Sequence, residues 1–171
     1  EMKHYELENP MNPEQQYLRI SLIPGILKNI SENLKNFAEI GIFEIGRVYL
    51  PHAQIKDKES RSEADILPGE RARLAIAIVL DQDKGSETFF ELKGLISNFL
   101  QRVIGTDSNI KFIKSDNSII KLWHPARYAD IRINNKVNIG IIGEISPFVL
   151  SAHKITKRVA VAEFYLDDFT D

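Results

Sequence analysis

Residues 40–50 read IGIFEIGRVYL, and residues 71–80 read RARLAIAIVL. Alternation along the first stretch would send even-numbered and odd-numbered side chains to opposite sides of an extended chain. In the second stretch both sides are apolar, with Leu74, Ile76 and Ile78 on one side and Val79 among alanines on the other. A strand with two apolar sides needs cover on both, as a central strand beneath helices has. The two stretches therefore predict strands, the second of them central.

Helical periodicity appears on both sides of these strands. Ser21 resembles a helix N-cap with Pro24 in the first turn, and apolar residues follow at helical spacing as far as Phe37. A second amphipathic pattern covers residues 89–103 and ends before Gly105, a residue type typical of helix ends. A shorter helix is predicted from Ser146-Pro147 to about residue 153.

Further strand patterns complete the prediction. They cover residues 3–8, 110–113, 128–133, 137–145 and 158–167. Asn134-Asn135 joins two of them, and asparagine tolerates the backbone of a tight hairpin. The polar stretch 51–70, which contains two prolines, is predicted to be a long, mobile loop. The pattern as a whole predicts one α+β domain, a mostly antiparallel sheet with two substantial helices.

Length and composition exclude several classes of protein. The chain has 171 residues, a net charge of −2 and no cysteine. About 150 residues make one ordinary domain, so one domain is expected. The absence of cysteine excludes a disulfide scaffold, a cysteine nucleophile and thiolate zinc sites. No apolar run approaches the roughly 18 residues of a membrane span, and we expect a cytoplasmic protein with no membrane association.

Few residues suggest chemistry by spacing alone. The four histidines are far apart in the sequence, so no metal site is predicted. Asp167-Asp168 would point to opposite faces of a strand and would not share a proton. Lys154, Lys157 and Arg158 form a compact basic cluster, for which a solvated face is a better interpretation than an RNA contact. No phosphate-binding loop or nucleophile elbow is present.

Five segments nevertheless occur in a characteristic order. They are residues 18–27 (LRISLIPGIL), 43–49 (FEIGRVY), 90–94 (FELKG), 124–131 (HPARYADI) and 140–147 (GIIGEISP). Together they resemble the catalytic-like module of the bacterial phenylalanyl-tRNA synthetase beta subunit, from about Leu7 to Phe169. One departure is Ser146-Pro147, where the family often has His-Pro.

The resemblance implies a class II synthetase-like fold, a mostly antiparallel sheet flanked by helices. It implies that these residues are an incomplete module of a larger beta subunit, largely without the interface helix that precedes residue 18 in the family. It also implies partners: the alpha subunit of the enzyme and, through the parent complex, tRNA(Phe). ATP and Mg²⁺ would be cofactors of the parent enzyme, and none is expected for this module.

The same resemblance predicts that the site is degenerate. The related alpha subunit, which carries the active site, reads roughly Gly-Arg-Val-Phe-Arg in motif 2, where this chain keeps Arg47 but has Leu50 in place of the second arginine. In motif 3 the alpha pattern, roughly Gly-Leu-Gly-Ile-Asp-Arg-Leu, aligns with Glu163, Tyr165 and Asp168 in place of two glycines and the arginine. Arginine grips phosphate through paired donors, so these changes should abolish useful ATP affinity, and no catalytic residue is expected.

Other family-motif residues are expected to be structural. Arg47, Arg19 and Arg127 are interpreted as members of ion pairs, Arg47 with Glu44 or another acid on the sheet, and His124-Pro125 as a turn entering a strand. The remaining positions of this kind are Pro24, Gly25, Gly46, Gly140, Gly143 and Glu144.

Three functions follow as hypotheses. The favoured one is a non-catalytic structural module that supports the alpha subunit's catalytic domain and (αβ)₂ assembly for aminoacylation of tRNA(Phe). The alternatives are an active adenylate-forming class II-like ligase domain, against which Leu50 and Asp168 argue, and a standalone protein-interaction module that shares the fold.

Overall fold

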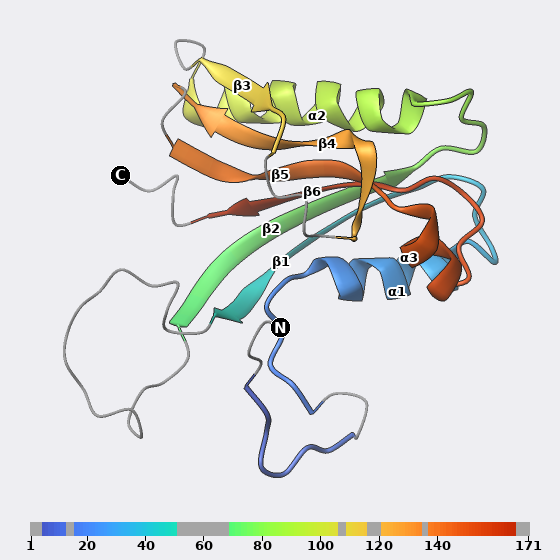
Figure 1. Ribbon diagram of the computed structural model, residues 1–171, viewed down its shortest axis with the longest axis vertical. Coiled ribbons are helices and arrows are strands. Elements are labelled where there is room, and N and C mark those ends of the chain that lie inside the picture. The colour runs from blue at the N-terminus through green and yellow to red at the C-terminus, as the bar shows by residue number, and fades with distance from the viewer. Residues whose placement is uncertain are drawn as a thin grey trace.

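The computed structural model describes residues 5–12, 16–50, 69–105, 109–115, 121–134 and 137–166. Its centre is a six-stranded antiparallel sheet in the order β1-β2-β6-β5-β4-β3 (Figure 1). Strand β6, the last described strand in the sequence, therefore lies in the middle of the sheet, between the β1–β2 hairpin and the three strands β5, β4 and β3. The α+β class and the antiparallel sheet predicted from the sequence are confirmed.

The β1–β2 hairpin consists of Ile40–Leu50 and Gly69–Val79. β1 has the predicted bounds, and β2 lies between β1 and β6, as its two apolar sides indicated. The predicted loop was too long at its end, because Gly69 pairs with Leu50 and Glu70 with Tyr49. Antiparallel register requires this: a partner for all of β1 must begin at residue 69. Residues 51–68 lie outside the described part of the chain.

The other half of the sheet holds β3 (Ile110–Ile113), β4 (Trp123–Ile133), β5 (Val137–Ile145) and β6 (Ala160–Tyr165). β4 begins five residues earlier than predicted. Its pairing with β5 jumps from Trp123 to Tyr128, and this irregularity accommodates Pro125, which has no amide for a regular ladder. The predicted turn at His124-Pro125 is thus an irregular segment inside a strand. At the predicted hairpin Asn134 has φ 50°, and Asn135 lies outside the described residues.

Helix α1 (Ile23–Asn33) begins two residues after the predicted N-cap. Leu22 occupies the cap position, but the Ser21 hydroxyl still accepts a hydrogen bond from the Ile23 amide at 3.1 Å. Pro24 lies in the first turn as predicted. Phe37 does not belong to the apolar face, because the helix ends at Asn33 and leaves its ring exposed.

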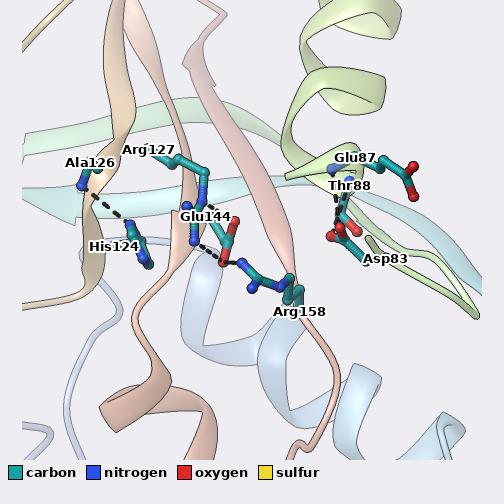
Figure 2. A network of polar contacts seen from close by, with 8 residues as sticks. All are labelled: Asp83, Glu87, Thr88, His124, Ala126, Arg127, Glu144 and Arg158. Atoms are coloured by element: carbon teal, nitrogen blue, oxygen red, sulfur yellow. Dashed lines mark hydrogen bonds and ion pairs between the residues drawn. The ribbon is translucent and has the colours of Figure 1, made fainter. Parts of the chain in front are cut away.

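Helix α2 (Glu87–Ile104) ends before Gly105, which has φ 98°. Its first turn is capped by Asp83, whose carboxylate accepts hydrogen bonds from the Glu87 and Thr88 amides (Figure 2). Burial acts to raise the pKa of Asp83, but hydrogen bonds from Thr88 and Glu87 outweigh burial and lower that pKa below its ordinary value. Helix α3 (Pro147–Ala152) is capped by Ser146, as expected for Ser-Pro.

Two apolar cores lie on opposite faces of the sheet. The α1 face packs Ile26 and Ile30 of the helix against Val48 and Ala77. The α2 face packs Leu92, Ile96 and Leu100 against residues such as Phe164. Helix α1 contacts β1 and β2, whereas α2 lies across β2, β6, β5 and β3 (Figure 1). β2 and β6 contribute to both cores, which explains their apolar character on both sides.

Two family-motif glycines of β5 allow close approach. A β-carbon at Gly140 would overlap the Glu163 carbonyl of the neighbouring strand, and one at Gly143 would overlap the Trp123 ring. Gly41 of β1 differs, because no atom lies within 4 Å of the position its β-carbon would take.

Gly140→Ala should therefore lower the free energy of unfolding by about 1–3 kcal/mol, because β6 would have to shift away from β5. Gly41→Ala is the matched control and should change it by less than about 0.5 kcal/mol. Urea unfolding followed by circular dichroism measures both. Equal effects of the two substitutions would show that the strand approach at Gly140 imposes no constraint.

Candidate functional site

The degenerate motif 3 supplies a buried carboxylate on the α1 face. Glu163 of β6 accepts hydrogen bonds from the Leu22 amide at 2.6 Å, the Ser21 hydroxyl at 3.0 Å and Nη1 of Arg73 at 2.5 Å. Its side chain is only 6% exposed. One carboxylate thus joins the start of α1 to two neighbouring central strands.

Tyr165 also contacts the guanidinium group of Arg73. Its hydroxyl accepts a hydrogen bond from Nη2 of Arg73 at 3.2 Å, and the guanidinium carbon lies 4.5 Å from the ring centroid. Arg73 is therefore held by a carboxylate, a hydroxyl and a ring face together. The two described motif-3 residues predicted from the sequence occur together, whereas the prediction missed their central partner, Arg73.

A signal for Arg73 was present in the sequence. Arg73 lies on the same side of its strand as Ala75 and Ala77, and Glu163 lies among apolar residues in AVAEFY. A charged side chain on an apolar face of a central strand needs an opposite charge there. The sequence could therefore have predicted an ion pair between Arg73 and Glu163.

Leu50, which stands where the resemblance places the ATP-contacting arginine, lies in the apolar core on the α1 face and is 8% exposed. It is a packing residue, and its side chain offers no donor for a phosphate. Asp168, the third predicted motif-3 residue, lies outside the described part of the chain, as does Asp167.

Arg19 links the segment before α1 to β1. Its Nε donates to the Arg47 carbonyl at 2.8 Å, and Nη1 forms an ion pair with Glu44 at 2.7 Å. A β-carbon at Gly46 would overlap this guanidinium, so Gly46 leaves the path of Arg19 open. Gly25 faces the same carboxylate but has ordinary van der Waals space for a side chain.

Arg47 itself points to the opposite face of β1 and pairs with Glu70 at 2.8 Å. The prediction that Arg47 pairs with an acid on the sheet is confirmed, with Glu70 rather than Glu44 as the partner. Both side chains of this pair are largely exposed.

A second buried carboxylate lies at the end of β5. Glu144 is 2% exposed and binds two guanidinium groups, Arg127 through Nε (2.5 Å) and Nη2 (3.0 Å) and Arg158 through Nη1 (2.9 Å). Figure 2 shows this network beside His124. Burial, with the nearby charges of Arg127 and Arg158, lowers the pKa of His124 below its ordinary value against the opposing effect of Glu144. Nδ1 of His124 accepts a hydrogen bond from the Ala126 amide at 3.2 Å.

Across the described segments, no group of histidine, aspartate and glutamate side chains could hold a metal ion. In the same part of the chain, no helix is long and apolar enough to span a membrane.

Solved structures share this fold. Two structures of pyrrolysyl-tRNA synthetase from Desulfitobacterium hafniense superpose with a TM-score of 0.65 at 16% and 15% sequence identity. Each match covers 97% of this chain and 51% of the other. At such identity the likeness establishes the fold alone: the chain shares the antiparallel sheet and flanking helices of these synthetases.

The sequence comparisons are more specific. The chain belongs to the family described as "Phenylalanyl tRNA synthetase beta chain CLM domain", which matches residues 1–166. Relatives named phenylalanine–tRNA ligase beta subunit are 33% identical in Lactococcus lactis and 30% identical in Bacillus subtilis, each over 92% of this chain. In both cases the match spans only 18% of the relative, so the chain corresponds to about a fifth of their length. The family predicted from the ordered motifs is confirmed.

Glu163→Gln should lower the free energy of unfolding by about 3–5 kcal/mol, because it leaves the buried guanidinium of Arg73 without a counter-charge. Glu44→Gln removes a carboxylate from the exposed pair with Arg19 and should cost only about 0–1 kcal/mol. Urea unfolding of both variants beside the wild type provides the measurement. If the two substitutions cost the same, the Arg73–Glu163 pair is not the anchor of the α1 face.

Proposed function

We propose that this chain is a non-catalytic structural module of the phenylalanine–tRNA ligase beta subunit. In this role it supports the catalytic domain of the alpha subunit and the assembly of an (αβ)₂ enzyme in the cytoplasm. That enzyme joins phenylalanine to tRNA(Phe) with ATP and Mg²⁺, which the alpha subunit binds. Membership of the beta-chain family supports the choice of partner.

The observation that carries the non-catalytic assignment is the buried Glu163. In the motif-3 pattern of the related alpha subunit its position belongs to a glycine, where an open backbone leaves room beside the sheet. Here a carboxylate fills that position and is saturated by Arg73, Ser21 and Leu22. The carboxylate side chain occupies the space that a glycine would leave open, and its charge is already balanced by Arg73, so the position offers a phosphate neither room nor a free donor.

Leu50, at the end of β1, also supports the non-catalytic assignment. A class II site binds ATP with guanidinium forks, which supply paired donors to phosphate oxygens. The isobutyl group of Leu50 supplies none and is already packed in the core. Binding ATP here would require both a new donor and the expulsion of a buried ion pair.

In an NMR titration with millimolar ATP and Mg²⁺, the amides of Leu50, Arg73 and Glu163 should show no saturable shifts, because the ion pair already fills the α1 face. The alpha subunit, titrated in the same buffer, is the positive control. Saturable shifts at these three amides would contradict the non-catalytic assignment.

The assembly role predicts co-purification. The chain, co-expressed with the alpha subunit of the same organism, should be retained by a tag on the alpha subunit and elute with it as one species in gel filtration. The same residues within the full-length beta subunit form the second arm of the experiment. Retention in neither arm would refute the assembly role and leave the absence of ATP binding to be judged separately.

A further inference from the structure

A hollow of about 470 Å³ lies where β4 and β5 meet α3 and the segment leading into β6. It is separate from the α1-face group around Glu163, because none of Arg73, Glu163 and Tyr165 lines it. Its size falls within the range of roughly 300–1,000 Å³ that is common for small-molecule sites. Its walls are His124, Arg127, Glu144, Pro147, Leu150, Ser151 and residues 154–158.

The walls carry an excess of positive charge. Four cationic side chains, those of Arg127, Lys154, Lys157 and Arg158, line the hollow with one carboxylate, that of Glu144. Lys157 forms an ion pair at 2.7 Å with Asp81, which does not line the hollow. Counting that pair still leaves a surplus of two positive charges in a chain whose net charge is −2. The basic cluster noted in the sequence is therefore one wall of a concave site.

The two arginines are positioned but not saturated. Both bind Glu144, Arg127 through Nε and Nη2 and Arg158 through Nη1. Nη1 of Arg127 and Nη2 of Arg158 make no hydrogen bond to any residue that the structure describes. A single buried carboxylate thus fixes two guanidinium planes while leaving donors for a further acceptor, and guanidinium forks match phosphate and carboxylate geometry.

Lys154 supplies a further cation in the wall of the hollow. It has φ 57°, the left-handed conformation that usually falls to glycine or asparagine after a helix. Within the described residues, the Lys154 ammonium has no ion-pair partner. This conformation ends α3, because the Lys154 amide donates to the Ser151 carbonyl and the Ile155 amide donates to the Leu150 carbonyl, and it leaves the Lys154 side chain in the wall of the hollow.

The opposite part of the hollow is apolar. Leu150 and Ile155 are buried beneath it, and Pro147 lies at its rim. A bare ion would leave this surface unused, whereas an organic body attached to an anionic group would cover it. The hydroxyls of Ser151 and Thr156 provide two further donors along the wall.

We propose that this hollow is an anion-binding site that takes a small organic molecule by its oxyanion group. The oxyanion, a phosphoryl or a carboxylate group, lies between Arg127, Arg158 and Lys154, and the organic body rests on Leu150 and Ile155. This site lies apart from the Glu163 group and requires no ATP on the α1 face.

The imidazole of His124 is a built-in reporter of occupancy. Burial and the positive charges of Arg127 and Arg158 lower the pKa of His124, and an anion placed beside the imidazole would raise it. Ring-proton NMR should therefore record a saturable rise in the pKa of His124 when phenyl phosphate or benzoate is added. Sodium chloride at the same ionic strength is the salt control and should produce no such rise.

Three probes distinguish the chemistry. Inorganic phosphate, phenyl phosphate and benzoate are titrated separately against the 171-residue chain. Phenyl phosphate binding more tightly than benzoate would assign a phosphoryl group, and the reverse order would assign a carboxylate. Phenyl phosphate binding no more tightly than inorganic phosphate would overturn the assignment of an organic ligand.

Variants locate the site. Lys154→Asn removes one charge yet tolerates the left-handed backbone, and Arg158→Gln leaves Glu144 paired with Arg127. Each should weaken binding by about fivefold. Lys28→Gln, on the exposed side of α1, removes the same charge elsewhere and should leave binding unchanged.

Circular dichroism confirms that each variant is folded before titration, and Lys154→Asn alone suffices if Arg158→Gln unfolds. A rise in the His124 pKa that chloride reproduces would overturn the proposal, and so would equal affinity in Lys154→Asn and the wild type.

Discussion

The α1 face depends on one buried carboxylate, that of Glu163. It bonds together the start of α1, the central strand β2 and the central strand β6. Breaking a buried ion pair by removing one partner is costly because the other charge remains desolvated. The chain therefore holds its helix on the sheet through a polar contact surrounded by apolar core, and that contact specifies where α1 begins.

This anchor explains why α1 starts where it does. Leu22 is in helical conformation although its position would suit a side-chain cap, and its amide donates to Glu163 instead. Ser21 donates its hydroxyl proton to the same carboxylate while accepting from the Ile23 amide. An N-cap prediction based on local sequence placed the boundary early because the acceptor for the helix amides comes from a strand 141 residues away.

Most of the fold could be predicted because its signals are local. β1, β3 and β5 have the predicted bounds, and the two long helices were found from their apolar periodicity. The errors at Gly69 and Trp123 arise from strand partners, since a strand's extent is set by what pairs with it. In the candidate site, Glu163 and Tyr165 came from a family pattern, whereas Arg73 and the hollow around Lys154 depend on which distant segments meet.

The two buried carboxylates of the sheet, Glu163 and Glu144, differ in how completely they balance the positive charge around them. Glu163 binds one guanidinium and is also saturated by a hydroxyl and an amide, so its surroundings have no unmatched charge to offer a ligand. Glu144 binds two guanidinium groups at once, so positive charge remains after the pairing. Burial, together with the charges of Arg127 and Arg158, lowers the pKa of the neighbouring His124. The sheet thus carries a fully matched buried ion pair on its α1 face and a concave, cationic surface at the end of β5, where an anion would compensate the positive charge that Glu144 leaves unmatched.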